Sequence, residues 1–117
     1  MSNLQTGNTG ETIACDFLKK LGYKIIERNY RIRGGELDII CQDGDDLVFV
    51  EVKTRNSHEY GDPAEAVTPH KIRFLIRSVQ FYLNKYDLFS HPYRLDAITV
   101  DFLENGKIEH FKNITNS

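Results

Sequence analysis

Two short segments joined by an acidic turn constrain the fold of this chain most. Residues 34–41 and 47–53 are rich in Ile, Leu and Val, and the run Asp-Gly-Asp-Asp between them is typical of a hairpin turn. Side chains alternate faces along a strand, so Glu36 and Asp38 share one face, as do Glu51 and Lys53. The two segments therefore predict an antiparallel hairpin that gathers charged side chains on one face.

The position of the turn decides which of these side chains lie opposite each other. If residues 44–45 form the loop, Asp38 faces Glu51 and Glu36 faces Lys53. A loop shifted by one residue makes Asp38 and Glu51 diagonal neighbours. Like charges at such positions destabilise a sheet, and a divalent cation relieves their repulsion. The pattern therefore suggests a metal site.

The remaining positions of the hairpin indicate which face is buried. One face is wholly apolar and consists of Leu37, Ile39, Cys41, Val48, Val50 and Val52. The acidic face carries Ile40, Leu47 and Phe49 near the turn, so we expect it to be half covered. A buried, unpaired carboxylate is costly, so the acids need partners. A ladder of cross-strand salt bridges and a metal ion both supply them, but the ladder does not explain why Asp38 opposes Glu51.

Length and composition favour a single domain over residues 1–117, with its core at about residues 9–103. The chain has 117 residues, of which 40% are hydrophobic. It contains no apolar run of about 18 residues and begins without a signal-peptide pattern, so we expect a cytoplasmic protein without a membrane span. Cys15 and Cys41 are expected to be core thiols, and the four scattered histidines do not suggest zinc.

The charge is unevenly distributed along the chain. The net charge is −2, yet residues 19–33 hold six basic side chains and one acidic one, a local charge of +5. A second basic group, His70, Lys71, Arg73 and Arg77, begins the second expected helix. Such patches suit contacts with a nucleic-acid backbone. Solvated helix and strand faces have a similar composition, so the pattern does not decide between the two.

Apolar periodicity and turn residues predict the element order α-β-β-β-α-β-β. A helix is expected from near Thr9 to Gly22, and a second from Thr68-Pro69 to about Tyr86. The other expected elements are a strand at 23–33, the hairpin, a loop at 56–63, a strand at 93–102, a turn at Asn105-Gly106 and a last strand at 107–114. This order indicates an α/β fold with a mixed central sheet flanked by helices.

Two further acids lie where a charge needs an explanation. Glu11 sits at the edge of the buried stripe of the first helix, where it either points toward the sheet or interacts with the helix dipole. Asp96 lies among apolar residues in a predicted strand. A structural salt bridge, with Arg94 or Lys71, is its expected role.

The combination of these residues resembles the PD-(D/E)XK nuclease superfamily, which has the restriction-endonuclease-like fold. More narrowly, the chain is similar to the YraN-type family of predicted bacterial endonucleases. The matching stretches are Thr9-Gly10-Glu11 with Ala14, Gly22-Tyr23, Arg28 to Arg31, Gly35 to Asp38, Val48 to Arg55, residues 61–71 and Arg94-Leu95-Asp96. One departure from the superfamily pattern is Leu37, which stands where a proline often precedes the acid.

The resemblance implies a hydrolytic mechanism. Asp38, Glu51, the backbone carbonyl of Val52 and Glu11, directly or through water, would hold Mg²⁺ or Mn²⁺. Lys53 would orient the attacking water and offset charge developing on phosphorus. The resemblance therefore implies a metal-dependent phosphodiesterase, and it favours an endonuclease over an exonuclease.

The flanking residues suit a nucleic-acid substrate, with DNA favoured over RNA. The expected phosphate contacts are Arg31, Arg33, Arg55, Lys71 and Arg73, and Tyr60 is a candidate for stacking on an unpaired base. The expected activity is structure-selective or nonspecific cleavage, in DNA repair or recombination, with a homodimer or a protein partner to position the substrate. The alternatives are a non-catalytic nucleic-acid-binding or scaffold module and a structural domain with a salt-bridged hairpin.

Overall fold

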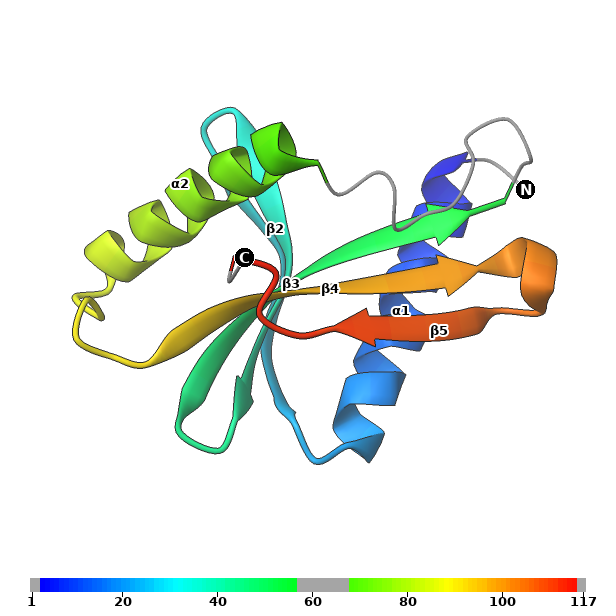
Figure 1. Ribbon diagram of the computed structural model, residues 1–117, viewed down its shortest axis with the longest axis horizontal. Helices are drawn as coiled ribbons and strands as arrows, with labels where there is room; N and C mark the ends of the chain where they lie inside the picture. The colour runs from blue at the N-terminus through cyan, green and yellow to red at the C-terminus, as the bar shows by residue number, and fades with distance from the viewer. Residues whose placement is uncertain (1–2, 57–67, 116–117) are drawn as a thin grey trace.

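The protein folds into a five-stranded mixed sheet with one helix on each face (Figure 1). The structure is a computed structural model and describes residues 3–56 and 68–115. The elements are α1 (Asn3–Lys20), β1 (Lys24–Ile32), β2 (Gly35–Asp43), β3 (Asp46–Arg55), α2 (Pro69–Lys85), β4 (Tyr93–Asp101), the 3₁₀ helix η3 (Phe102–Glu104) and β5 (Lys107–Phe111). The predicted order of helices and strands is confirmed. The expected loop at 56–63, with Tyr60, lies almost wholly outside the described residues.

The strands are arranged in chain order, β1-β2-β3-β4-β5, and all neighbours except β3 and β4 are antiparallel. Parallel neighbours need a long crossover, and the segment containing α2 supplies it. Thr68 caps α2 by accepting the N–H of Lys71 at 3.2 Å, and Pro69 stands in the first turn, as the sequence predicts.

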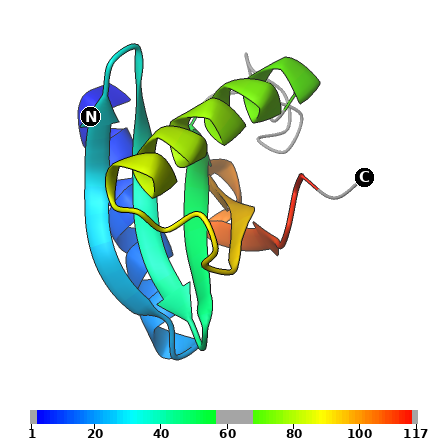
Figure 2. The ribbon, with the colours of Figure 1, turned by 90° about the vertical axis from the view of Figure 1, so that its left-hand side faces the viewer.

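The two faces of the sheet carry separate hydrophobic cores, each closed by one helix (Figure 2). Residues of α1 pack on one face, and those of α2 pack on the other. The α1 side includes Ala14, Leu18, Ile39, Val48, Val50 and Ile98, and the α2 side includes Ile40, Phe49, Leu75, Val79, Leu83 and Leu95. Ile40, Leu47 and Phe49 are fully covered by this packing, where the sequence predicted only half coverage. None of the described helices is both long and apolar enough to cross a lipid bilayer.

The first helix begins earlier than the sequence predicts, at Asn3 instead of near Thr9. Gly7 in this stretch and Gly10 just after it lower the local helix propensity, so the sequence alone does not predict the early start. Packing explains the choice of one of them, because a Cβ on Gly10 would overlap Cγ2 of Thr54 in β3. The glycine thus lets the helix approach the sheet closely, an interaction that propensity does not record.

The β2–β3 hairpin has the register in which residues 44–45 form the loop. Ile39 pairs with Val50, and Asp43 pairs with Asp46 across the turn. The prediction for Leu37 is wrong, because Leu37 belongs to the α2-side core whereas Ile39 belongs to the α1-side core. Residues two apart normally share a face, so β2 must rotate between them.

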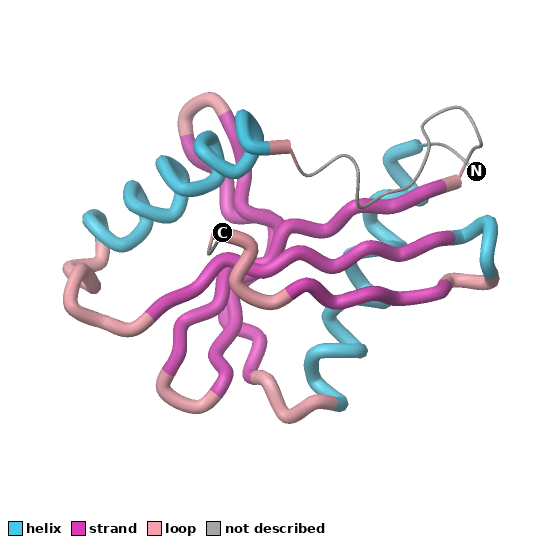
Figure 3. Tube along the Cα trace, in the orientation of Figure 1, coloured by secondary structure: helices cyan, strands magenta, loops and turns pink. Residues whose placement is uncertain are grey.

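A left-handed residue on the neighbouring strand coincides with that rotation. Asn29 has a φ of 53° and lies between the ladder pairs Arg28–Ile39 and Tyr30–Leu37. Asn tolerates this conformation better than most residues. The N-terminal part of β2, before Ile39, lies away from β3, and the two strands run apart there (Figure 3). The left-handed conformation of Asn29 thus kinks the sheet, and β2 and β3 separate beside Asp38. We call this point of separation the fork.

The far edge of the sheet is joined to the core through Asp96, which is fully buried in β4. The predicted salt bridge to Arg94 is confirmed, with its Nε 3.0 Å from Oδ1. Asp96 also hydrogen-bonds Nε2 of His110 at 2.8 Å and accepts the N–H of Asn113 at 2.9 Å. The predicted turn at Asn105-Gly106 has positive φ at both residues and leads into β5, which is shorter than expected.

Candidate metal and nucleic-acid site

Asp38 lies where β2 and β3 separate. The β2–β3 ladder ends at the pair Ile39–Val50, whereas β3 stays paired with β4 as far as Arg55. Beyond the fork the amides of β3 on the β2 side lose their strand partner. Oδ2 of Asp38 accepts one of them, the N–H of Val52, at 2.8 Å. The fork therefore positions the carboxylate and at the same time satisfies a backbone donor.

Three carboxylates from two elements converge beside this fork. One oxygen each of Glu11 in α1 and of Glu36 and Asp38 in β2 lie within 4.8 Å of one another. Carboxylate oxygens are the ligands that Mg²⁺, Ca²⁺ and Mn²⁺ prefer. Such a group repels itself unless a cation or a proton is shared among its members. The cluster therefore has the composition and the spacing of a site for a hard divalent cation.

Glu11 carries a buried oxygen that lacks a hydrogen-bond partner. Its Oε2 accepts no hydrogen bond from another described residue, and its ion pair with Nη2 of Arg28 is long, at 3.9 Å. Burial raises the pKa of Glu11, against the effect of a hydrogen bond from Asn29. A buried polar atom without a partner is costly, so this oxygen is suited to bind a cation, which the long ion pair with Arg28 does not replace. Of the two alternatives for Glu11, the structure supports the one in which the side chain points toward the sheet, since Glu11 lies beyond the first turn of α1 and its carboxylate meets those of Glu36 and Asp38.

The protonation of Asp38 reflects the same crowding. Burial, and after it the charge of Glu51, raise the pKa of Asp38 to about 8, although the N–H of Val52 favours the ionised form. A hydrogen bond between the Asp38 and Glu51 side chains adds to this rise, because it needs a proton on one of them. Asp38 therefore holds a proton near neutral pH unless a cation takes its place.

Glu51 is buried and is held by two lysines. Its Oε1 lies 3.1 Å from Nζ of Lys53 and 3.3 Å from Nζ of Lys71. Lys53 follows Glu51 by two residues on the same face of β3, and the first turn of α2 brings Lys71 to the site. Both ammonium groups thus stand beside the carboxylate cluster, where a phosphate would meet them.

The expected pairing of Glu36 with Lys53 is wrong. Glu36 pairs instead with Arg31, whose Nε lies 3.8 Å from Oε2, and Lys53 pairs with Glu51. The reason is the fork, which separates β2 from β3 before Glu36 is reached. Because Glu36 does not pair with Lys53, its carboxylate lies in the cluster instead, although the resemblance does not place it among the metal ligands. Its position two residues before Asp38, on the same strand face, was the available signal.

The five predicted phosphate-binding residues differ in their surroundings. Arg33 and Arg73 are exposed, and Arg31 is highly exposed despite its ion pair with Glu36. Lys71 contacts Glu51 as described above. Arg55 is instead tied to Asp101, with Nη1 3.4 Å from Oδ2, so it is the least available of the five for a phosphate contact.

Comparisons with known proteins place the chain in a family whose function is uncharacterised. A family model described as uncharacterised protein family UPF0102 matches residues 10–100. A UPF0102 protein of Dehalococcoides mccartyi is 44% identical over 110 residues, which cover 93% of this chain and 91% of that protein. A UPF0102 protein of Syntrophus aciditrophicus is 46% identical over 112 residues, covering 95% of this chain and 88% of its relative. The matched region contains the fork, all three clustered carboxylates and both site lysines, and the chain belongs to the UPF0102 family.

Proposed function

We propose that this protein is a metal-dependent nuclease that hydrolyses phosphodiester bonds of DNA. The observation that carries the proposal is the convergence of Glu11, Glu36 and Asp38 on one point, with an unpartnered oxygen on Glu11. A surface that only binds nucleic acid gains nothing from clustered carboxylates, because they repel phosphate. The cluster becomes favourable only when a cation joins it.

The residues fit Mg²⁺ or Mn²⁺. Glu11, Glu36 and Asp38 would hold the ion, and Glu51 and the backbone carbonyl of Val52 complete the proposed ligand set. A divalent cation in such a site polarises a phosphoryl oxygen and lowers the pKa of bound water. Glu36 joins the ligands that the resemblance implies, which are Asp38, Glu51, Val52 and Glu11.

The chain's own groups supply the remaining tasks. Lys53 and Lys71 bring two fixed positive charges beside the carboxylates, and either can offset charge that develops on a phosphate. We assign the orientation of the attacking water to Lys53, which lies on the same strand face as Glu51. Arg31, Arg33 and Arg73 would bind flanking phosphates. The α/β arrangement around one mixed sheet supports the restriction-endonuclease-like fold and the YraN-type PD-(D/E)XK assignment as part of this proposal.

A panel of labelled nucleic acids tests the proposal. Single strands, duplexes, flaps, four-way junctions and RNA are incubated with Mg²⁺, Mn²⁺ or EDTA. We expect ion-dependent cleavage of DNA, with internal cuts and a preference for branched or partly single-stranded substrates, as a role in repair or recombination requires. Size-exclusion chromatography with light scattering, run with and without substrate, reports whether a dimer is involved.

Matched variants separate chemistry from folding. Asp38→Ala and Lys53→Ala should each lower the cleavage rate by about 10²-fold or more. Asp16→Ala on α1 and Lys107→Ala on β5 remove the same charges from exposed positions and should cut like the wild type. Binding without cutting, unchanged by EDTA and by the site variants, would leave the non-catalytic binding module as the function.

A further inference from the structure

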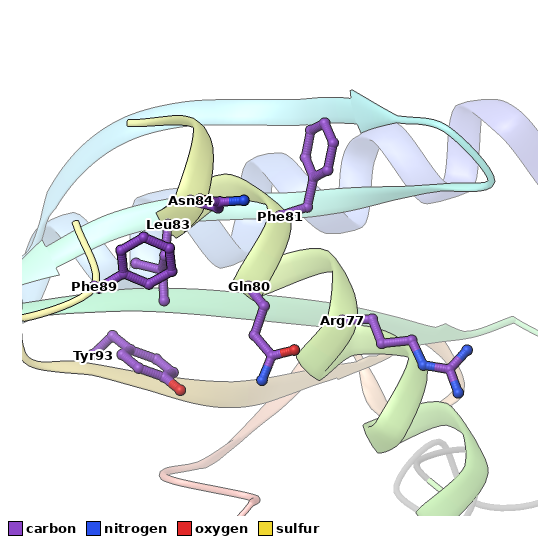
Figure 4. A pocket seen from close by; sticks show the side chains of 7 residues that line it. All are labelled: Arg77, Gln80, Phe81, Leu83, Asn84, Phe89 and Tyr93. Atoms are coloured by element: carbon purple, nitrogen blue, oxygen red, sulfur yellow. The ribbon is translucent and has the colours of Figure 1, made fainter. Parts of the chain in front are cut away.

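A pocket of about 430 Å³ lies between the second half of α2 and the start of β4, away from the carboxylate cluster (Figure 4). Its lining includes Arg77, Gln80 and Asn84 from α2, Phe89 from the following loop and Tyr93 from β4. In Figure 4 the ends of the Gln80 and Tyr93 side chains point into the space between them, below Phe89, whereas Phe81 points away from Tyr93. The pocket thus combines two aromatic walls with amide groups and one guanidinium.

Both aromatic walls are unusually open to solvent for their type. The exposed fraction is 62% for Phe89 and 45% for Tyr93. The Tyr93 ring is nonetheless supported from the core, because it makes an edge contact with Phe49 at a centroid distance of 6.4 Å. A supported ring with one open face is a stacking platform for another flat group. The aromatic pair therefore favours a planar ligand.

The charge of α2 indicates that the ligand is a polyanion. The 17 residues of the helix contain Lys71, Arg73, Arg77 and Lys85 and no acidic residue. Neither Arg73 nor Arg77 forms an ion pair with another residue of the described ranges. Planar groups carried on a polyanionic backbone are the chemistry of nucleic acids.

Exposed polar residues of α2 extend from the end of the helix near the carboxylate cluster to the pocket. Arg73, Arg77, Gln80 and Asn84 are exposed at intervals of four, three and four residues, so they form one stripe along the helix. The stripe starts in the same turn as Lys71, which contacts Glu51 from another face of the helix, and from Lys71 to Asn84 the helix rises by roughly 20 Å at 1.5 Å per residue. A stacked strand covers that distance with about six nucleotides, and an extended strand with fewer.

We propose that the pocket holds an unpaired base of a single-stranded DNA segment whose backbone follows the α2 stripe away from the carboxylate cluster. The inference rests on the proposed nuclease function and narrows its substrate to DNA with a single-stranded arm. The base stacks on Phe89 and Tyr93, Gln80 and Asn84 offer hydrogen bonds to its edge, and Arg77 binds an adjacent phosphate.

Binding measured in EDTA tests the pocket without cleavage. Fluorescence anisotropy compares a single strand of about twelve deoxyadenylates with a strand of equal length and charge made only of abasic units. The wild type should bind the base-bearing strand roughly 5- to 100-fold more tightly. Phe89→Ala should lose most of this preference while its affinity for the abasic strand stays the same, and Arg77→Gln should weaken both strands equally.

Phe111→Ala is the matched control, because Phe111 is an exposed phenylalanine on β5. It should keep the preference for bases, and circular dichroism should show that all variants are folded. Equal wild-type affinity for both strands, or equal losses in Phe89→Ala and Phe111→Ala, would overturn the inference. So would a dimer that depends on Phe89, since the pocket would then be an interface between protein copies.

The outcomes distinguish this inference from the proposed function. If the wild type cleaves DNA but Phe89→Ala keeps the base preference, the pocket assignment is wrong and the nuclease proposal stands. If the wild type shows a Phe89-dependent base preference but cuts no substrate with either ion, the pocket stands as a binding site and the hydrolytic proposal is wrong.

Discussion

At the scale of single residues, the carboxylates near the fork are crowded together, and their mutual repulsion destabilises the folded protein. Asp38 is largely buried and lies beside Glu51, Glu11 and Glu36, and its single backbone hydrogen bond does not compensate for this crowding. Stored instability of this kind is common at functional sites, where a ligand relieves it. A proton can take the place of the ligand, which makes the effect measurable by titration.

The free energy of unfolding should fall as the pH rises from about 5 to 8 in EDTA. The folded-state pKa of Asp38 is raised to about 8, so the folded protein holds a proton that the unfolded chain releases near pH 4. Stability from this proton is complete below pH 4 and is lost as the pH approaches 8. The raised pKa of Glu11 acts in the same direction. Urea denaturation at a series of pH values measures the slope.

Asp38→Asn isolates the contribution of the site, since other titrating groups cancel in the difference from wild type. The variant should flatten most of the slope, whereas Asp16→Asn on the exposed face of α1 should leave it as it is. Mg²⁺ should stabilise the wild type increasingly as the pH rises, and should have little effect on Asp38→Asn. An Asp38→Asn profile parallel to that of wild type would contradict the assignment.

At the scale of elements, one backbone conformation opens the site. Asn29 adopts a φ of 53° in the middle of β1, opposite the position where β2 rotates and leaves β3. Its side chain also reaches Glu11, so the kink and the cluster are linked through one residue. The site is therefore built into the hairpin rather than attached to a loop.

Asn29→Ala should be less stable than Asn29→Gly by about 1 kcal/mol, because only the alanine suffers the left-handed conformation. Both variants lose the hydrogen bond to Glu11, so their difference reports the backbone alone. The same pair at Glu27, an exposed strand residue without a positive φ, should show the opposite order. Chemical denaturation of the four variants checks this, and alanine equal to or better than glycine at position 29 would contradict it.

The contact of α1 with β3 predicts a second departure from ordinary propensity. Gly10→Ala would add about 1 kcal/mol of stability to an ordinary helix. Here it should cost about 1–3 kcal/mol, because the new methyl group overlaps Cγ2 of Thr54. Thr54→Ser removes that methyl group, so Gly10→Ala should be much better tolerated in the serine background. A double-mutant cycle of unfolding free energies measures this coupling, and additive effects would contradict it.

At the scale of the whole molecule, the buried Asp96 joins the C-terminal strand to the sheet. Burial acts to raise the pKa of Asp96, but hydrogen bonds from His110, Asn113 and Arg94 lower it below its ordinary value. The carboxylate therefore stabilises the fold above about pH 4, and this stabilisation is lost as the pH falls below its depressed pKa. Arg94 extends the network to Tyr23 near the end of α1 through a 2.7 Å hydrogen bond.

Asp96→Asn should cost about 3–5 kcal/mol, because it removes the buried charge that Arg94 and His110 require. Asp46→Asn is the matched control, since Asp46 pairs with the same Arg94 at 3.2 Å from an exposed position. We expect it to cost less than about 1 kcal/mol. Urea denaturation compares the two, and hydrogen exchange should show faster opening of β5 in Asp96→Asn alone. Similar costs for both variants would mean that burial does not govern the interaction.

Much of the fold could be predicted from local sequence. Alternation, helical spacing and turn chemistry predicted the order of the elements, the Thr68 cap and the turn at Asn105-Gly106, because each depends on near neighbours in the chain. For the hairpin they left two registers open, and the structure has the one with the loop at residues 44–45. The same reasoning paired Asp96 with Arg94, since a charge in an apolar strand requires a partner.

Other features depend on contacts between residues distant in the chain, which local sequence patterns do not predict. The close approach of α1 to β3 depends on Gly10 facing Thr54, and the face of Leu37 depends on a rotation of β2 opposite Asn29. That rotation separates Glu36 from Lys53 and turns it to Glu11 and Asp38. By itself the sequence determined which acids were near the site. The fork determined which of them converge, because a strand that leaves its neighbour no longer follows the pairing that alternation predicts.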